Sequence, residues 1–143
     1  MEISNYCNLF LSGLAANVAF ARSTVAAFCA PMGPTLEEIN DIKTAVSEAV
    51  NNCIVHGYVG QMGEVHIEIL LFEDMAQITV QDYGCGIGNI EEAMQPFFTS
   101  KPEDERSGMG FTLMQAFMDE VEVTSEIGKG TTVVMRKRFA ANA

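Results

Sequence analysis

The sequence predicts an α/β fold, namely a two-layer α+β sandwich in which a mixed, largely antiparallel sheet carries helices on one face. Three observations predict it. Residues 65–71 and 76–80 alternate apolar and polar side chains, as half-buried strands do. Residues 15–30 and 39–53 repeat apolar side chains at helical spacing. No internal repeat or linker interrupts these patterns, so we expect one domain spanning residues 1–143.

The first half of the chain is predicted to hold one strand and two helices. Residues 5–12 alternate loosely as a strand, and residues 15–30 follow as a helix. Two prolines within residues 31–34 then break the chain. Thr35 followed by Glu38 matches a capping box. This box opens a long helix, whose expected core stripe comprises Ile39, Ile42, Val46, Ala49 and Cys53.

The second half is predicted to hold two hairpins with a loop-rich region between them. The first hairpin turns at Glu73-Asp74, and the closing hairpin joins residues 121–127 to 131–139. Between the hairpins lie a glycine-rich loop, a short helical piece and a charged segment at residues 96–107. We expect that segment to act as a lid. A further helix is expected over residues 108–118.

Composition restricts the functional class. The chain has 143 residues, of which 48% are hydrophobic and 19% charged, as in a folded protein. Its net charge of −11 and its pI near 4.4 disfavour nucleic acid and suit a basic protein partner. No apolar run reaches about 18 residues, and no signal peptide begins the chain, so we expect a cytoplasmic protein that does not enter a membrane. The four cysteines lack metal-ligand spacing and are expected to be reduced thiols, three of them buried and Cys85 the exception.

A polar stripe accompanies the core stripe of the long helix. Glu48, Asn52 and His56 stand at i, i+4 and i+8, so they share one narrow face. By itself this is also the pattern of a solvated face that ends in a glycine cap at Gly57. The Asn52 carboxamide oxygen is a suitable ligand for Mg²⁺ between phosphates, and the Glu48 carboxylate is a candidate general base.

Two glycine clusters point to a nucleotide. Asp82 ends a strand and is followed by the alternating glycines of residues 84–88, which let a flat ligand approach the backbone. Its carboxylate suits an exocyclic amine such as that of adenine, although a tight turn with a structural aspartate has the same pattern. Gly108-Met-Gly110 opens a helix, where free N–H groups attract anions, or it forms a hinge. Lys101 and Arg106 lie between the clusters, in the expected lid. Neither cluster matches a dinucleotide-binding or P-loop fingerprint.

In combination, these segments resemble the GHKL ATP-binding superfamily. Its N, G1, F and G2 boxes and closing Gly-Thr motif match Glu48-Ala-Val-Asn-Asn52, Asp82-x-Gly84-x-Gly86-Ile87, Phe97-Phe98, Gly108-Met-Gly110 and Gly130-Thr131-Thr132. Within the superfamily, SEAVNNCIVHGY, FARSTVAAF and KPEDERSGMGFTLM are similar to the anti-sigma serine kinases of spore-forming bacteria. The similarity runs from about Asn17 to Phe139.

This resemblance implies a Bergerat-type fold that binds ATP and Mg²⁺, forms a homodimer and acts as a protein-serine kinase. It implies two alternating partners: a sporulation sigma factor that is held inactive, and an anti-anti-sigma protein that is phosphorylated on serine. Glu48 would be the base and Asn52 the metal ligand, while Arg22 and Arg106 would meet partners. The implied nucleotide contacts are Asn52, His56, Asp82, Gly84, Gly86, Ile87, Lys101, Arg106, Ser107, Gly108, Met109, Gly110, Phe111 and Thr132.

The sequence departs from the family pattern at Ser12–Ala16, which is more apolar than the polar turn expected there. Several related functions remain open at this stage. Stress-response anti-sigma kinases share every motif. A gyrase- or chaperone-type ATPase would use Glu48 to activate water but needs a transducer domain. The catalytic half of a histidine kinase needs a phosphoacceptor helix. A sequestering module without significant kinase activity would use nucleotide only as a conformational ligand.

Overall fold

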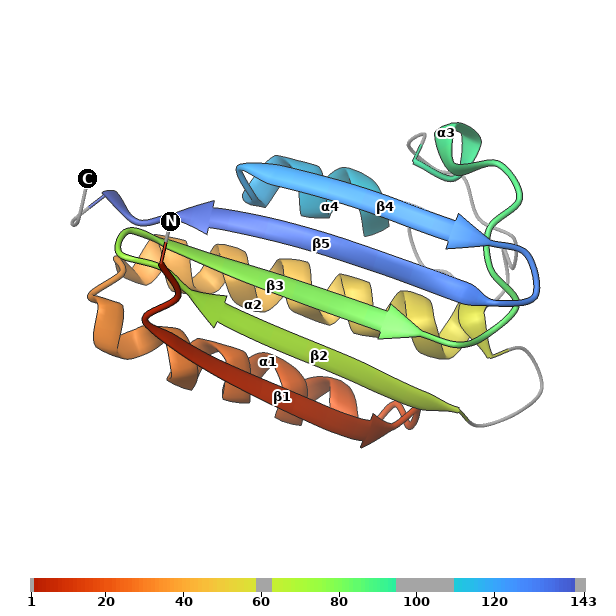
Figure 1. Cartoon of the computed structure of the whole chain (residues 1–143), viewed down its shortest axis with the longest axis horizontal. Helices are drawn as coiled ribbons and strands as arrows, with labels where there is room; N and C mark the ends of the chain where they lie inside the picture. Colours follow the sequence, from red (N-terminus) through yellow and green to blue (C-terminus); the bar gives the residue numbers. More distant parts are fainter. Residues whose placement is uncertain (1, 59–62, 95–109, 141–143) are drawn as a thin grey trace.

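The computed structural model describes residues 2–58, 63–94 and 110–140. Five strands form one sheet in the order β1-β2-β3-β5-β4, and all its strand pairings are antiparallel (Figure 1). The strands are β1 (Asn5–Ser12), β2 (Glu64–Leu71), β3 (Met75–Asp82), β4 (Glu120–Glu126) and β5 (Gly130–Arg138). The sheet therefore agrees with the predicted one, and each predicted hairpin is present.

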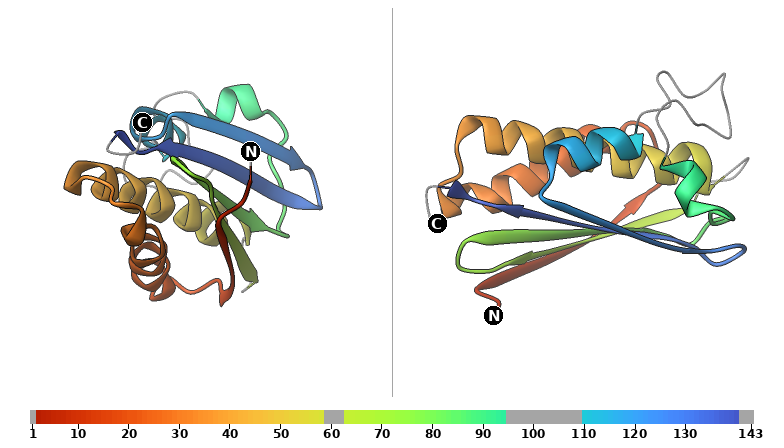
Figure 2. Two further views of the ribbon diagram at one scale, coloured as in Figure 1. Left: turned by 60° about the vertical axis from the view of Figure 1, so that its left-hand side comes forward. Right: turned by 90° about the horizontal axis from the view of Figure 1, so that it is seen from above.

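The helices lie on one face of this sheet (Figure 2). They are α1 (Asn17–Cys29), α2 (Leu36–Asn52), the short α3 (Ile90–Ala93) and α4 (Gly110–Phe117), with the helical turns η1 (Ala30–Met32) and η2 (Cys53–Gly57). Helix α2 lies in the middle and packs against both α1 and α4. The predicted two-layer sandwich is thus confirmed. In the described part of the chain, no helix is both long and apolar enough to span a bilayer.

The start of α2 is fixed by the predicted capping box. The Thr35 hydroxyl accepts the Glu38 N–H at 3.1 Å, and the Glu38 carboxylate accepts the Thr35 N–H at 2.8 Å. These two bonds satisfy N–H groups that the first turn leaves without helical partners. The other Glu38 oxygen accepts the Ala140 N–H at 2.9 Å. The Glu38 side chain therefore also holds Ala140 beside the start of the central helix.

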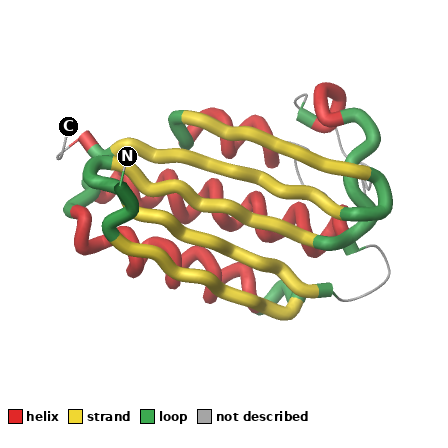
Figure 3. Tube along the Cα trace, in the orientation of Figure 1, coloured by secondary structure: helices red, strands yellow, loops and turns green. Residues whose placement is uncertain are grey.

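The core lies between the sheet and the helices. Alternate residues of β2 and β3 are buried there, in agreement with the period-two pattern. Figure 3 shows the two layers, with the strands in yellow and the helices behind them in red. From α2 the buried residues are Ile42, Ala45, Val46, Ala49 and Val50, which cover most of the predicted stripe. Ile39 is only partly buried, because it lies in the first turn of the helix, at the edge of the layer.

The end of α2 differs from the prediction. After Asn52 the α-helix continues as the π turn η2, in which each hydrogen bond spans five residues instead of four. Tyr58 follows directly after this turn. Gly57 is not a left-handed cap, so the alternative interpretation of the stripe as a solvated face that ends in a glycine cap is wrong on this point. A tertiary contact explains the glycine at position 57 instead, because an added Cβ would stand 2.9 Å from the Asp82 carboxyl carbon.

The four cysteines are free thiols, as expected. Cys29 and Cys53 are buried, and Cys85 is exposed. Cys7, on the edge strand β1, is only half-buried. Burial raises the pKa of the Cys29 thiol to about 12, which keeps it protonated.

Candidate nucleotide site

The predicted site residues gather at one end of the sandwich. There β3 ends at Asp82, α2 gives way to η2, α4 begins at Gly110, and the turn between β4 and β5 closes the edge (Figure 1). Lys101, Arg106, Ser107, Gly108 and Met109 lie outside the described residues, as do Phe97 and Phe98. The remaining predicted residues can each be placed.

Glu48 and Asn52 meet the first residue of α4. An added Cβ on Gly110 would stand 3.2 Å from Asn52 Nδ2, 3.3 Å from Asn52 Oδ1 and 3.5 Å from Glu48 Oε2. The predicted stripe therefore does not face open solvent at these two positions. No hydrogen bond joins the Asn52 carboxamide to any other described side chain, so its oxygen is available to a ligand.

The Asp82 carboxylate is buried at the base of the site, with only 4% of the residue exposed. Its Oδ1 accepts the Gly84 N–H at 2.9 Å. Burial raises the pKa of Asp82, and the nearby Gly84 N–H, Cys53 thiol and Thr131 N–H oppose the rise by stabilising the carboxylate. A carboxylate offers about four acceptor positions, so acceptor positions remain for an incoming N–H donor.

The glycine loop after Asp82 is fastened on two sides. The Cys85 N–H donates to the Gly57 carbonyl at 2.8 Å, and the Gly128 N–H donates to the Cys85 carbonyl at 2.7 Å. Gly84 has no space for a Cβ, which would collide with the Gly57 carbonyl oxygen. Gly86 takes a left-handed φ of 79° and packs against the Glu126 carbonyl oxygen. The glycines thus serve both close backbone contact and loop curvature.

For three other predicted nucleotide contacts, the structure gives the position of the residue but no hydrogen bond or ion pair with Asn52 or Asp82. His56 lies in η2, half-buried, and its carbonyl oxygen is 3.0 Å from the Cys85 thiol. Ile87 lies in the glycine loop and donates its N–H to the Ser125 hydroxyl at 2.6 Å. The Phe111 side chain is buried in the hydrophobic core, so only its backbone is left to face a ligand.

Thr132 is not brought together with Asp82. It pairs with Gln81 of β3, on the face of the sheet away from the helices. Thr131 is buried on the helix side, where Asp82 is buried as well. We therefore replace Thr132 by Thr131 as the candidate contact. The sequence held the necessary signal, because Thr131, Val133 and Met135 share the inward set of β5 while Arg136 belongs to the outward set.

The sequence matches the histidine kinase-like ATPase domain family over residues 11–137. The chain belongs to this GHKL family. Anti-sigma F factors of Bacillus thuringiensis, Bacillus mycoides and Bacillus anthracis are each 56% identical to it over 134 residues, which cover 93% of this chain and 92% of theirs.

Solved structures share the GHKL fold at lower identity. A crystal structure of the RsbU and RsbW domains of a Mycobacterium tuberculosis protein superposes with a TM-score of 0.69 at 19% identity, over 95% of this chain. This chain spans 33% of that longer chain. A mycobacterial sensor histidine kinase gives a TM-score of 0.56 at 19% identity, over 71% of this chain and 72% of that one. These two similarities concern the fold alone.

The observed geometry fits the nucleotide that a GHKL domain implies. Gly84 and Gly110 let the chain pack closely against Gly57 and against the Asn52 and Glu48 side chains, and buried Asp82 accepts the Gly84 N–H while retaining acceptor positions for a ligand. Mg²⁺ bound by phosphates takes one or two protein oxygens, and the unbonded Asn52 carboxamide can supply one. Glu48, one turn earlier on α2, lies on the same side, facing Gly110.

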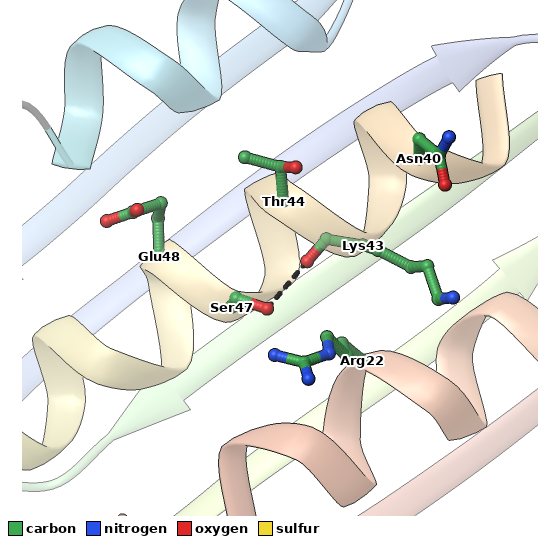
Figure 4. A pocket seen from close by; sticks show the side chains of 6 residues that line it. All are labelled: Arg22, Asn40, Lys43, Thr44, Ser47 and Glu48. Atoms are coloured by element: carbon green, nitrogen blue, oxygen red, sulfur yellow. Dashed lines mark hydrogen bonds between the residues drawn. The ribbon is translucent and has the colours of Figure 1, made fainter. Parts of the chain in front are cut away.

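A pocket of about 410 Å³ between α1 and α2 adjoins Glu48 (Figure 4). It is lined by Arg22, Asn40, Lys43, Thr44, Ser47 and Glu48. Figure 4 shows Arg22 and Lys43 reaching into it from the two helices, while Glu48 extends from the other side of α2.

These two pocket cations differ from the others in the described part of the chain. Lys129, Arg136, Lys137 and Arg138 each pair with a carboxylate, at distances of 3.2, 2.9, 3.1 and 3.6 Å. Within the described residues, neither Arg22 nor Lys43 has an ion pair through its side chain. In a chain of net charge −11, two unpaired cations in one pocket make a local site for an anionic group. Lys43 was not among the residues that the sequence singled out.

Proposed function

We propose that this GHKL protein is an anti-sigma factor and an ATP-dependent protein-serine kinase. It binds ATP and Mg²⁺, sequesters a sporulation sigma factor and phosphorylates a serine of an anti-anti-sigma partner. The observation that carries this proposal is the meeting of Glu48 and Asn52 with Gly110. It brings a candidate base, a candidate metal ligand and a helix N-terminus into one place, which is the combination that phosphoryl transfer to a hydroxyl requires.

Each residue has a separate task in the proposed reaction. Asp82 accepts a hydrogen bond from the exocyclic amine of adenine, and Asn52 would hold Mg²⁺ through its carboxamide oxygen. Glu48 takes the proton of the acceptor serine as its oxygen attacks the γ-phosphorus and ADP departs. The Mg²⁺ ion would supply partial neutralisation of the phosphate charge. Backbone N–H groups at the start of α4 stabilise the transferring group electrostatically.

The pocket beside Glu48 supports a protein acceptor. Because Glu48 also lines this pocket, the chain that carries a serine to Glu48 can extend over the neighbouring surface of α1 and α2. Arg22 and Lys43 are unpaired there among the described residues, and both favour a partner that carries an acidic group. Arg106 is proposed as a further partner contact and lies outside the described residues. We assign the same face to the sigma factor, so that the two partners compete for it.

We also propose that the protein is a homodimer that acts in the cytoplasm as one domain. The edge strand β1 carries no charged residue, and Tyr6 and Phe10 are 68% and 61% exposed on it. An uncharged edge with exposed aromatic rings is typical of a surface that another chain covers. The four free thiols support a reducing compartment.

A sequestering module without significant kinase activity is the second candidate, and a stress-response-type anti-sigma kinase shares the same site. The free Asn52 carboxamide serves a nucleotide-binding module equally well. Only the proximity of Glu48 to Gly110 favours chemistry over binding alone. The decisive experiment therefore targets Glu48.

The experiment compares the wild type with Glu48→Gln, using labelled ATP, a candidate anti-anti-sigma protein and phosphoamino-acid analysis. We expect phosphoserine with the wild type and a rate about 10²–10⁴-fold lower with Glu48→Gln, at nearly unchanged ATP affinity. Gln115→Ala, an exposed change on α4, is the matched control and should retain the wild-type rate. Nucleotide binding and sigma-factor binding without phosphoserine would instead favour the sequestering module. Co-purification with one sigma factor distinguishes the sporulation type from the stress-response type.

A further inference from the structure

The Ser125 hydroxyl connects three separate parts of the candidate site. Ser125 lies on β4, half-buried on the helix side of the sheet, and pairs directly with Thr131 of β5. Its hydroxyl accepts the Ile87 N–H of the glycine loop at 2.6 Å and stands 3.0 Å from the Gly130 carbonyl oxygen. It also lies 2.8 Å from the Thr131 hydroxyl oxygen. One side chain of the closing hairpin therefore contacts both the glycine loop and the candidate nucleotide contact Thr131.

These three contacts determine the direction of each hydrogen bond. A serine hydroxyl has one hydrogen to donate and two lone pairs that accept. The Gly130 carbonyl oxygen can only accept, so the single hydrogen of Ser125 points to it. The Ile87 N–H takes one lone pair of Ser125, and the second lone pair remains for the Thr131 hydroxyl. Thr131 is therefore the donor in the contact between the two hydroxyls, and every hydrogen-bonding position of Ser125 is occupied.

This arrangement leaves the Thr131 hydroxyl as an acceptor only. Its single hydrogen points to Ser125, and within the described part of the chain the hydroxyl has no other hydrogen-bond partner. Thr131 is 9% exposed and lies on the same face as buried Asp82, one register step beyond the Gln81–Thr132 pair. The Asp82 carboxylate is an acceptor as well. The base of the site thus holds two acceptors on adjoining strands, one in a carboxylate and one in a hydroxyl.

We propose that Ser125 is a positioning residue that fixes the Thr131 hydroxyl as a second acceptor beside Asp82, and thereby sets the preference for adenine over hypoxanthine nucleotides. The proposal rests on the ATP site proposed above. The exocyclic amine of adenine has two N–H groups and can donate to both acceptors. Hypoxanthine carries an oxygen at that position, which two acceptors reject because no hydrogen lies between the oxygen atoms. Through Ile87, the same Ser125 hydroxyl holds the glycine loop against the closing hairpin.

Loss of the Ser125 hydroxyl should change the base preference. In Ser125→Ala the Thr131 hydrogen is free to turn toward an oxygen of the ligand, so rejection of hypoxanthine relaxes. We expect the ATP-to-ITP affinity ratio to fall about three- to tenfold, which corresponds to one neutral hydrogen bond. ATP affinity should fall as well, because the Ile87 N–H loses its acceptor. Ser125→Thr keeps the hydroxyl and should keep the ratio.

The test is titration of ATP and ITP into the wild type, Ser125→Ala, Ser125→Thr and the matched control Thr124→Ala. Thr124 precedes Ser125 on β4 and is exposed on the opposite face of the sheet, so its truncation should leave the ratio unchanged. Thr131→Val completes a double-mutant cycle. With no hydroxyl at residue 131, the addition of Ser125→Ala should not change the ratio further, whereas a merely structural role of Ser125 would change it equally in both backgrounds.

The outcomes separate the role of Ser125 from the ATP site. A wild type that prefers ATP, beside a ratio in Ser125→Ala within twofold of the wild type or equal changes in the two backgrounds, would overturn the role of Ser125 alone. A wild type that binds ATP and ITP equally would overturn the second acceptor. A wild type that binds neither nucleotide would overturn the proposed ATP site and this inference with it.

Amide hydrogen exchange of the nucleotide-free protein supplies a readout that does not depend on binding. The Ile87 N–H should exchange faster in Ser125→Ala than in the wild type, because its acceptor on β4 is lost. In Ser125→Thr and Thr124→Ala it should exchange as in the wild type. Equal exchange in Ser125→Ala and the wild type would contradict the bond from Ile87 to Ser125 and overturn the inference.

Discussion

Gly110 lies against the Asn52 carboxamide so closely that an added Cβ would stand 3.2 Å from Nδ2 and 3.3 Å from Oδ1. This relationship joins two segments that lie far apart in the sequence, the end of α2 and the beginning of α4. A side chain at residue 110 would therefore crowd the Asn52 carboxamide. Small changes at Gly110 should affect the proposed metal ligand before they affect the fold.

Gly110→Ala tests this coupling. The new methyl group is closer to Asn52 than most carbon contacts, so the carboxamide must move by a few tenths of an ångström. Misplacement of a catalytic group by about 1 Å can cost 10²-fold in rate, and this smaller shift should cost about tenfold. Alanine is a better helix former than glycine, so thermal stability should hold or rise slightly. Lower activity at equal or higher melting temperature would support the assignment, whereas loss of both would indicate a packing defect.

Asn52→Ala tests the metal assignment. Removing the carboxamide takes away one oxygen from a site that uses only one or two protein ligands. We expect most of the Mg²⁺-dependent part of ATP binding to disappear, while binding measured with a chelator present stays nearly constant. Asn52→Asp retains an oxygen but adds negative charge beside the phosphates, so it should be intermediate. Calorimetric titration with and without Mg²⁺ measures all three proteins, and an Mg²⁺ dependence in Asn52→Ala equal to that of the wild type would refute the assignment.

Local patterns in the sequence predicted most of the secondary structure. The capping box at Thr35 and Glu38 fixed the start of α2 through its own side chains, and alternation in β2 and β3 matched their burial. Such signals lie within a few residues of the element that they specify. The strand order, with β5 between β3 and β4, was not predicted. It depends on pairing between segments about 60 residues apart, such as Gln77 with Arg136, which local patterns do not encode.

The site was predicted in part for the same reason. Glu48, Asn52 and Asp82 were identified from residue type and spacing, and the fold places each of them at one end of the sheet. The π turn was missed because the apolar spacing of α2 continues into it, whereas the contact between Gly57 and Asp82 joins segments far apart in the sequence. The face on which Thr132 lies could have been predicted, because the alternation in β5 separates it from the inward Thr131.

The raised pKa of Asp82 predicts a pH dependence of nucleotide binding. Burial raises this pKa above the ordinary value of 3.8, and adenine requires the ionised acceptor. ATP affinity should therefore fall, by at most tenfold per pH unit, as pH is lowered through the raised pKa, and ATP binding should release protons there. In the free protein the sign is opposite: ionised Asp82 subtracts from stability above its folded pKa, and that loss is recovered as pH falls through it.

Calorimetry in buffers of different ionisation enthalpy measures this proton release directly. Asp82→Asn removes the titrating group and should bind ATP weakly with no proton release in the same pH range. A wild-type affinity that is flat from neutral pH down to the ordinary aspartate range would contradict the assignment of Asp82 as the adenine acceptor.

The unpaired cations of the α1–α2 pocket predict how the acceptor protein binds. Lys43→Met keeps the alkyl stem of the side chain and removes its charge, so packing between the helices should be preserved. We expect the KM for the acceptor protein to rise about three- to tenfold while kcat and ATP affinity stay close to wild type, since Lys43 does not contact the transferring group in the proposed reaction. The difference in KM between Lys43→Met and the wild type should shrink at high salt, because screening weakens the same interaction in the wild type.

Arg138→Met is the matched control, because Arg138 already pairs with Asp74 and is absent from the pocket lining. An equal effect of the two variants, or a Lys43→Met effect that is independent of salt, would show that the pocket does not hold an acidic group of the acceptor.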